Sequence, residues 1–150
     1  MKRITALLLS LLLLAGLCGC GTKKAADLPS LYDSLAPSLP EMLVLEGETR
    51  LNLTGIPAED CSQVVVAICG SGLRADEVWL VEARDAAALE RIKALAEDRL
   101  AAKRAETEDY LPDQFQVVQQ AQTLTEGLFF ALLVSPDAAA LRDAVRAALR

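Results

Sequence analysis

The sequence predicts an α+β fold in which an antiparallel sheet of about four strands is packed against two long amphipathic helices, in the order β-β-α-α-β-β-α. Three observations indicate this fold. β-Branched residues dominate segment 63–69, as is typical of a strand buried on both faces. Segments 86–106 and 137–149 each place apolar residues at helical spacing. Because each helix has one apolar stripe to bury, we expect the two helices to cover at least one face of the sheet.

Short segments precede the central strands. Pro29 opens a segment of apolar residues at helical spacing, which are Leu28, Leu31, Tyr32 and Leu35. We expect this helix to dock onto its own domain, and the alternative is a helix that binds a partner. Residues 42–45 are an apolar run that fits an edge strand, and residues 48–54 fit a brief helix that Gly55 ends.

Two strands follow, at residues 63–69 and at Glu77–Ala83, and their short connection permits antiparallel pairing. Trp79, the only tryptophan, alternates with apolar neighbours in the second strand, so we expect core packing rather than carbohydrate stacking. The Gly70-Ser71-Gly72 sequence is expected to be a turn. It lacks both the Gly-Lys-Ser/Thr end of a phosphate-binding loop and the third glycine of a dinucleotide fingerprint.

The strongest helical segment, 86–106, begins directly after Asp85, a favourable N-cap residue. Its apolar stripe contains Leu89, Ile92, Ala96, Leu100 and, toward its edge, Leu95. Residues 112–119 are expected to form a short helix that begins at Pro112.

The last three elements are a hairpin and a helix. Segments 121–124 and 128–134 flank a turn that contains Gly127, where a hairpin requires positive φ. Ser135, Pro136 and Asp137 are expected to be the N-cap, the first residue and a first-turn acid of the final helix.

Residues 1–19 have the features of a secretory signal: a short basic head, an apolar run too brief to span a bilayer and small residues at its end. Leu17, Gly19 and Cys20 resemble the bacterial lipobox, in which the cysteine is lipidated and becomes the first residue of the mature protein. Cys18 is the poorer acceptor because the bulky Leu17 precedes it. An ordinary cleaved signal and an uncleaved membrane anchor are the alternatives.

A diacylglyceryl group on Cys20 supplies two acyl chains, and two chains hold a protein on a membrane durably. Residues 20–27 are then the lipidated cysteine and a tether that reaches roughly 23 Å when extended. Residues 28–150 are expected to form a single α+β domain. The predicted location is the extracytoplasmic face of the cell membrane.

The mature chain is acidic. The full chain has a net charge of −6, and removal of Lys2 and Arg3 with the signal segment lowers it to −8. No basic patch interleaved with aromatic residues remains, so no nucleic-acid partner is expected. The expected partners are the membrane, through Cys20, and an envelope protein or cell-wall component.

Most catalytic residue types are missing. The chain contains no histidine, which excludes Ser-His and Cys-His nucleophile pairs and the commonest zinc ligand. Cys61 and Cys69 are too few for a four-cysteine zinc site. Because the intervening residues predict one strand, these two thiols are expected to be free rather than bonded to each other. No catalytic residue, metal or cofactor is therefore predicted.

Adjacent acids occur in several places, and such pairs can serve glycoside hydrolysis or hold Ca²⁺. We expect them to be solvated surface residues, because neighbours in a strand point to opposite faces. They are Glu59 and Asp60, Asp76 and Glu77, Glu97 and Asp98, and Glu106, Glu108 and Asp109.

Two polar-tipped residues are candidates for interaction or for a structural latch. Arg99 lies beside the apolar stripe and is expected to reach Glu106 or a sheet edge. Tyr110 lies at the helix exit and is expected to hydrogen-bond inward. Two functions remain open: a membrane-tethered, non-enzymatic binding or assembly module, which we prefer, and a carboxylate-dependent enzyme that acts on cell-wall glycans.

Several short motifs follow one another along the chain in a characteristic order. They are Leu39-Pro40-Glu41-Met42, Gly55-Ile56, Ala75-Asp76-Glu77-Val78, Arg99, Tyr110 with Pro112 and Gln114, and Gly127 before a strand that ends in Ser135. This order resembles a family of small bacterial cell-envelope lipoproteins from Gram-positive anaerobes, catalogued as a domain of unknown function. The resemblance spans nearly the whole mature domain. It implies the lipoprotein location and the α+β fold, and it implies no activity.

Overall fold

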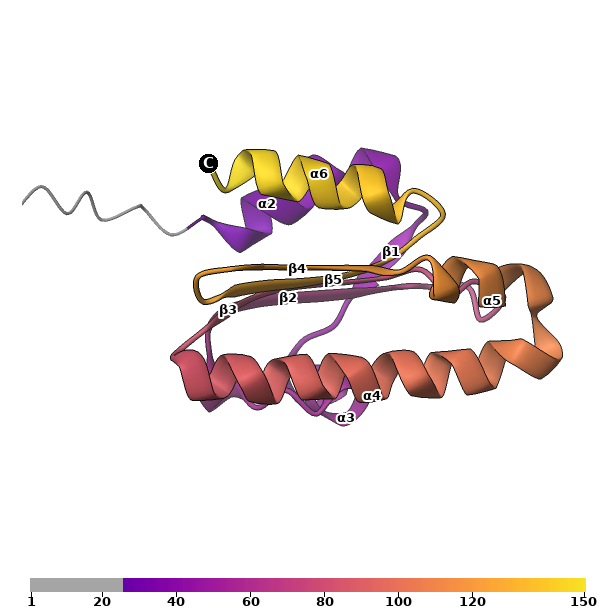
Figure 1. The fold of residues 1–150 in the computed structure, drawn as a ribbon, viewed down its shortest axis with the longest axis horizontal. Helices are drawn as coiled ribbons and strands as arrows, with labels where there is room; N and C mark the ends of the chain where they lie inside the picture. The colour runs from indigo at the N-terminus through magenta and orange to yellow at the C-terminus, as the bar shows by residue number, and fades with distance from the viewer. Residues whose placement is uncertain (1–25) are drawn as a thin grey trace, which may run out of the picture.

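The computed structural model describes residues 26–150 and consists of three layers, with a central sheet between two layers of helices (Figure 1). The sheet has five antiparallel strands in the order β1-β2-β3-β5-β4. The strands are β1 (Met42–Val44), β2 (Cys61–Cys69), β3 (Glu77–Ala83), β4 (Gln122–Glu126) and β5 (Phe129–Val134). The predicted α+β class with an antiparallel sheet is confirmed, and the fifth strand is the short edge strand β1.

The helices lie on both faces of the sheet, whereas the sequence did not separate the faces (Figure 1). Helices α2 (Leu28–Leu35) and α6 (Ala138–Ala148) cover one face, and α4 (Ala86–Tyr110) with α3 (Gly47–Thr54) lies on the other. Helix α5 (Pro112–Gln119) lies at one end of the sheet, and its Val118 joins the core beneath α4. Two short 3₁₀ turns, η1 (Ala36–Ser38) and η2 (Ala58–Asp60), complete the described elements.

The central strands explain this two-sided cover. All of β5 and nearly all of β3 is buried, so apolar side chains point out of both faces. Trp79 and Val81 of β3 join the core beneath α4, and Val78 and Leu80 join the core beneath α2 and α6. Each of the two predicted helices therefore has a face of its own, and Trp79 is a core residue as predicted.

Helix α2 docks onto its own domain, as expected. All four of its predicted stripe residues are buried in the core shared with α6. The side-chain amide of Gln63 in β2 holds the start of this helix: its Nε2 donates to the carbonyl of Ala26 at 3.1 Å, and its Oε1 accepts from the N–H of Leu28 at 3.1 Å. Ala26, the first described residue, therefore lies beside the start of β2.

Several boundaries differ from the prediction by a few residues. Helix α4 continues to Tyr110, because Lys103 and Thr107 extend its buried stripe beyond Leu100. Helix α6 begins at Ala138, with Asp137 rather than Ser135 at the N-cap. The hydroxyl of Ser135 instead accepts from the N–H of Asp137 at 3.2 Å, in a turn that precedes the helix.

Gly55 ends α3 as predicted, with φ of +72°. A Cβ at this position would lie 2.9 Å from a methyl carbon of Leu95. We expect Gly55→Ala to destabilise the protein by about 1–3 kcal/mol, measured by urea unfolding, because left-handed backbone and a steric clash act together. Gly47→Ala is the control, since Gly47 also has positive φ but has nothing within 4 Å of the added carbon. Equal losses for the two variants would show that the contact with Leu95 is unimportant.

Candidate functional site

The most concentrated group of charges in the described residues surrounds Glu77, the first residue of the central strand β3. Its side chain is fully buried. The carboxylate accepts from Trp79 Nε1 at 2.7 Å, from Arg99 Nε at 3.1 Å and Nη2 at 2.9 Å, and it pairs with Lys103 Nζ at 2.9 Å. Lys103 Nζ also donates to the carbonyl of Ala75 at 2.9 Å. Both oxygens of Glu77 are thus occupied by protein donors.

The secondary structure brings these residues together. Glu77 and Trp79 point to the same side of β3 because they are two residues apart. Arg99 and Lys103 are four residues apart and lie on the same side of α4, next to its apolar stripe. The cluster fastens the C-terminal half of α4 to the sheet, and its saturated carboxylate is a structural element rather than a catalytic acid.

Low pH is expected to weaken this cluster. Burial acts to raise the pKa of Glu77, but the hydrogen bonds and charges of Arg99 and Lys103 outweigh it, so the pKa lies below its ordinary value. A carboxylate with a lowered folded-state pKa contributes stability above the unfolded pKa of about 4.3, and that stability is lost as pH falls through the folded value. The melting temperature should therefore fall as pH drops below about 4. Glu77→Gln should show a shallower fall, and identical profiles would contradict this assignment.

Two further acids depart from the expectation of a solvated surface. Asp76 is buried and accepts from Arg74 Nε at 2.9 Å, and Asp60 is buried and accepts from Arg91 Nε at 2.9 Å. The hydrogen bonds from Arg91 lower the pKa of Asp60, although burial acts in the opposite direction. The surface prediction was therefore wrong for Asp60, Asp76 and Glu77, because each has a cation on a neighbouring element or turn. It is correct for the remaining acids, which are Glu59, Glu97, Asp98, Glu106, Glu108 and Asp109.

The structure separates the two candidate residues. Arg99 pairs with Glu77 in the middle of the sheet, rather than with Glu106 or a sheet edge. Tyr110 is the last residue of α4 and is 82% exposed, so it does not turn inward as expected. Its role in an interaction stays a prediction.

The two described cysteines are too far apart to bond to each other. Cys61 and Cys69 lie at opposite ends of β2, and both are free. Burial raises the pKa of the Cys61 thiol, which disfavours the thiolate form. The predicted lipidation at Cys20 lies outside the described residues.

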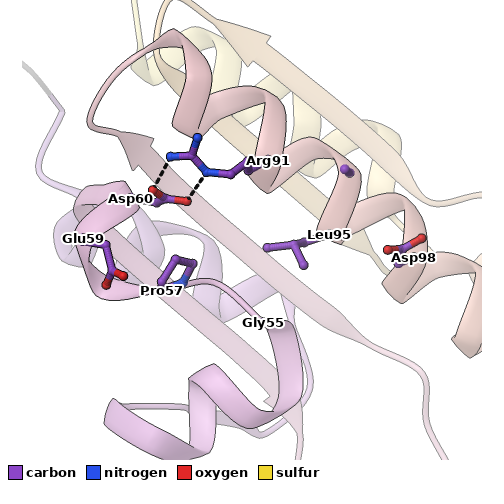
Figure 2. A pocket seen from close by; sticks show the side chains of 8 residues that line it. Gly55, Pro57, Glu59, Asp60, Arg91, Leu95 and Asp98 are labelled. Carbon is purple, nitrogen blue, oxygen red and sulfur yellow. Dashed lines mark hydrogen bonds and ion pairs between the residues drawn. The ribbon is translucent and has the colours of Figure 1, made fainter.

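An open groove lies between α4 and the segment that connects α3 to β2 (Figure 2). It has a volume of 630 Å³ and is lined by Gly55, Pro57, Glu59, Asp60, Arg91, Ala94, Leu95 and Asp98. Figure 2 shows Asp60 and Arg91 pointing toward one another at one end, Leu95 reaching across from α4, and Asp98 farther along the same helix. The groove combines an apolar floor with a charged rim, as is typical of binding sites.

The charged groups of the groove are arranged as follows. Its acids include no second carboxylate paired with Asp60, whose partner is Arg91. Within residues 26–150, no three side chains of histidine, cysteine, aspartate or glutamate gather closely enough to hold a metal ion. None of the described helices is both long enough and apolar enough to cross a membrane.

Sequence reasoning missed both the Glu77 cluster and the groove. A signal for the cluster was present, since Lys103 falls on the apolar stripe of α4, where an unpaired cation is unfavourable. The groove has no comparable signal, because its two walls come from segments about 35 residues apart.

Comparisons with known proteins place the chain in a family and assign it no activity. No curated protein matches the chain, and no solved structure matches it. One family model matches residues 38–135, from the end of η1 through the whole sheet, and leaves α2 and α6 outside the match. Its description is a domain of unknown function, DUF4358. Because the match covers more than half of the 150 residues, the chain belongs to the DUF4358 family.

Proposed function

We propose that the protein is a bacterial lipoprotein, anchored through Cys20 to the extracytoplasmic face of the cell membrane, whose domain acts as a non-enzymatic binding or assembly module. The observation that favours binding is the groove of Figure 2, which has an apolar floor, a charged rim and no catalytic pair. The lipobox pattern and the resemblance to envelope lipoproteins of Gram-positive anaerobes support the location.

The attachment of the N-terminal segment suits a tethered module. Gln63 holds Ala26 and Leu28 against β2. The lipid anchor would therefore be connected to the sheet through these hydrogen bonds and not only through the first turn of α2. The groove lies on the opposite face of the sheet from α2 and is not covered by it. A partner can therefore reach the groove while the anchor holds the domain near the membrane.

The alternative is a carboxylate-dependent enzyme acting on cell-wall glycans. Such an enzyme needs two facing carboxyl groups, one with a raised pKa. Burial raises the pKa of Glu82, but its partners across the sheet are Gln63 and Phe129, so no acid stands directly opposite it. Glu77 and Asp60 have lowered values and are paired with cations. This arrangement favours the binding module.

Anchoring is tested by Cys20→Ala. We expect this variant to leave the membrane fraction or to accumulate as an unprocessed precursor, because it lacks the thiol that accepts the lipid. Cell fractionation and intact-mass measurement check the result, with Cys18→Ala as the control that should behave as the unmodified protein. An unmodified mature terminus at another residue would contradict the proposal.

A further inference from the structure

We infer that the groove between α4 and the 55–60 segment binds an extended peptide segment of an envelope partner, in which a lysine or arginine stands beside an apolar residue. The inference rests on the proposed binding function and names the chemistry of the ligand. Three properties of the groove support it: its length, its floor and its unbalanced rim charge.

The length of the groove suits a short extended segment. Arg91, Ala94, Leu95 and Asp98 are spaced i, i+3, i+4 and i+7, so they form one face of α4. That face is about 10 Å long at 1.5 Å per residue, which corresponds to roughly three residues of extended peptide at 3.3 Å each. A volume of 630 Å³ also exceeds what a single small amine fills.

The floor is apolar and held in place by packing. Leu95 lies against Gly55, where the absence of a side chain allows the close approach. Pro57 and Ala94 complete the apolar surface beside it. An aliphatic side chain of the ligand, or the alkyl stem of a lysine, can cover this surface and remove it from water.

The rim has an excess of negative charge. Arg91 and Asp60 neutralise each other through two hydrogen bonds, whereas Glu59 and Asp98 form no ion pair with any other described residue. Both of these acids are exposed. A cationic side chain bound near Asp98 therefore meets uncompensated charge, and an anionic ligand would be repelled.

The test uses the full-length lipoprotein in detergent and an array of immobilised, acetylated hexapeptides with two randomised central positions. We expect the strongest binding to peptides that combine Lys or Arg with Leu, Ile, Met or Phe. Asp98→Asn should weaken this binding roughly two- to fivefold, the effect of one exposed ion pair. Ala94→Phe should abolish it, because the ring fills the groove.

Matched controls separate the groove from general charge effects. Glu97→Gln removes an equal charge from the adjacent exposed position on α4, and Ala102→Phe adds the same ring outside the groove, so both should bind as the unmodified protein does. Equal weakening by Asp98→Asn and Glu97→Gln would overturn the inference, as would equal binding of peptides that lack a basic residue. Equally strong binding of free cadaverine would assign the groove to a small cation instead.

The outcome is distinguishable from failure of the proposed function. If no peptide binds selectively while the protein remains in the membrane fraction and is lipidated at Cys20, the ligand class is wrong and the anchoring stands. Loss of lipidation with retained peptide selectivity would contradict the anchoring alone.

Discussion

Glu77→Gln is expected to lower the free energy of unfolding by about 3–5 kcal/mol, as for removal of one partner from a buried ion pair. Glutamine keeps the shape of the side chain and can still accept from Trp79 Nε1. It removes the negative charge that faces Arg99 and Lys103, whose side chains are only 16% and 9% exposed. Two cations then remain largely out of water without a counter-charge, which is the unfavourable state.

Urea unfolding at neutral pH measures this loss. Glu90→Gln is the matched control, because Glu90 pairs with Lys93 on the exposed side of α4 at 2.9 Å. Exposed pairs of this kind contribute about 0.2–1 kcal/mol, so the control should change stability little. A loss below about 1 kcal/mol for Glu77→Gln would show that water reaches the cluster and screens its charges.

The Glu77 cluster illustrates where prediction from the sequence fails. The bounds of strand β3 agree with the prediction, because its run of apolar residues outweighs one acid at its start. The same acid was interpreted as solvated, because acids are rarely buried without a partner. Its partners, Arg99 and Lys103, lie more than twenty residues away, and only the packing of α4 on the sheet brings them near.

Local signals, in contrast, were sufficient for most elements. Helix α5 has the predicted bounds because Pro112 fixes its start. Gly55 and Gly127 have the positive φ that their places in a helix end and a hairpin require. The faces of the sheet were not predicted, because apolar residues in β3 and β5 show burial without showing which helix covers which side.

The groove was not predictable from the sequence, because residues that are far apart in the chain form it. Asp60 and Arg91 are 31 residues apart, and neither has an unusual neighbour in the sequence. Leu95 was expected at the edge of the α4 stripe, and in the structure it is partly buried. A residue at the edge of a stripe can face either core or groove, and only the position of Gly55 and Pro57 decides this.

Ile92→Ala tests the packing of α4 on the sheet. Ile92 is fully buried in the core that contains Trp79 and Phe130. Truncation removes its apolar atoms and leaves a cavity that a close-packed core fills only in part, so stability should fall by about 2–5 kcal/mol.

Leu73→Ala is the control: Leu73 is 72% exposed, and its loss should change stability by less than about 0.5 kcal/mol. Both are measured by urea unfolding, and a loss below about 1 kcal/mol for Ile92→Ala would mean that α4 does not pack on this face as described. Because α4 also forms one wall of the groove, such a result would remove the structural basis for the groove as well.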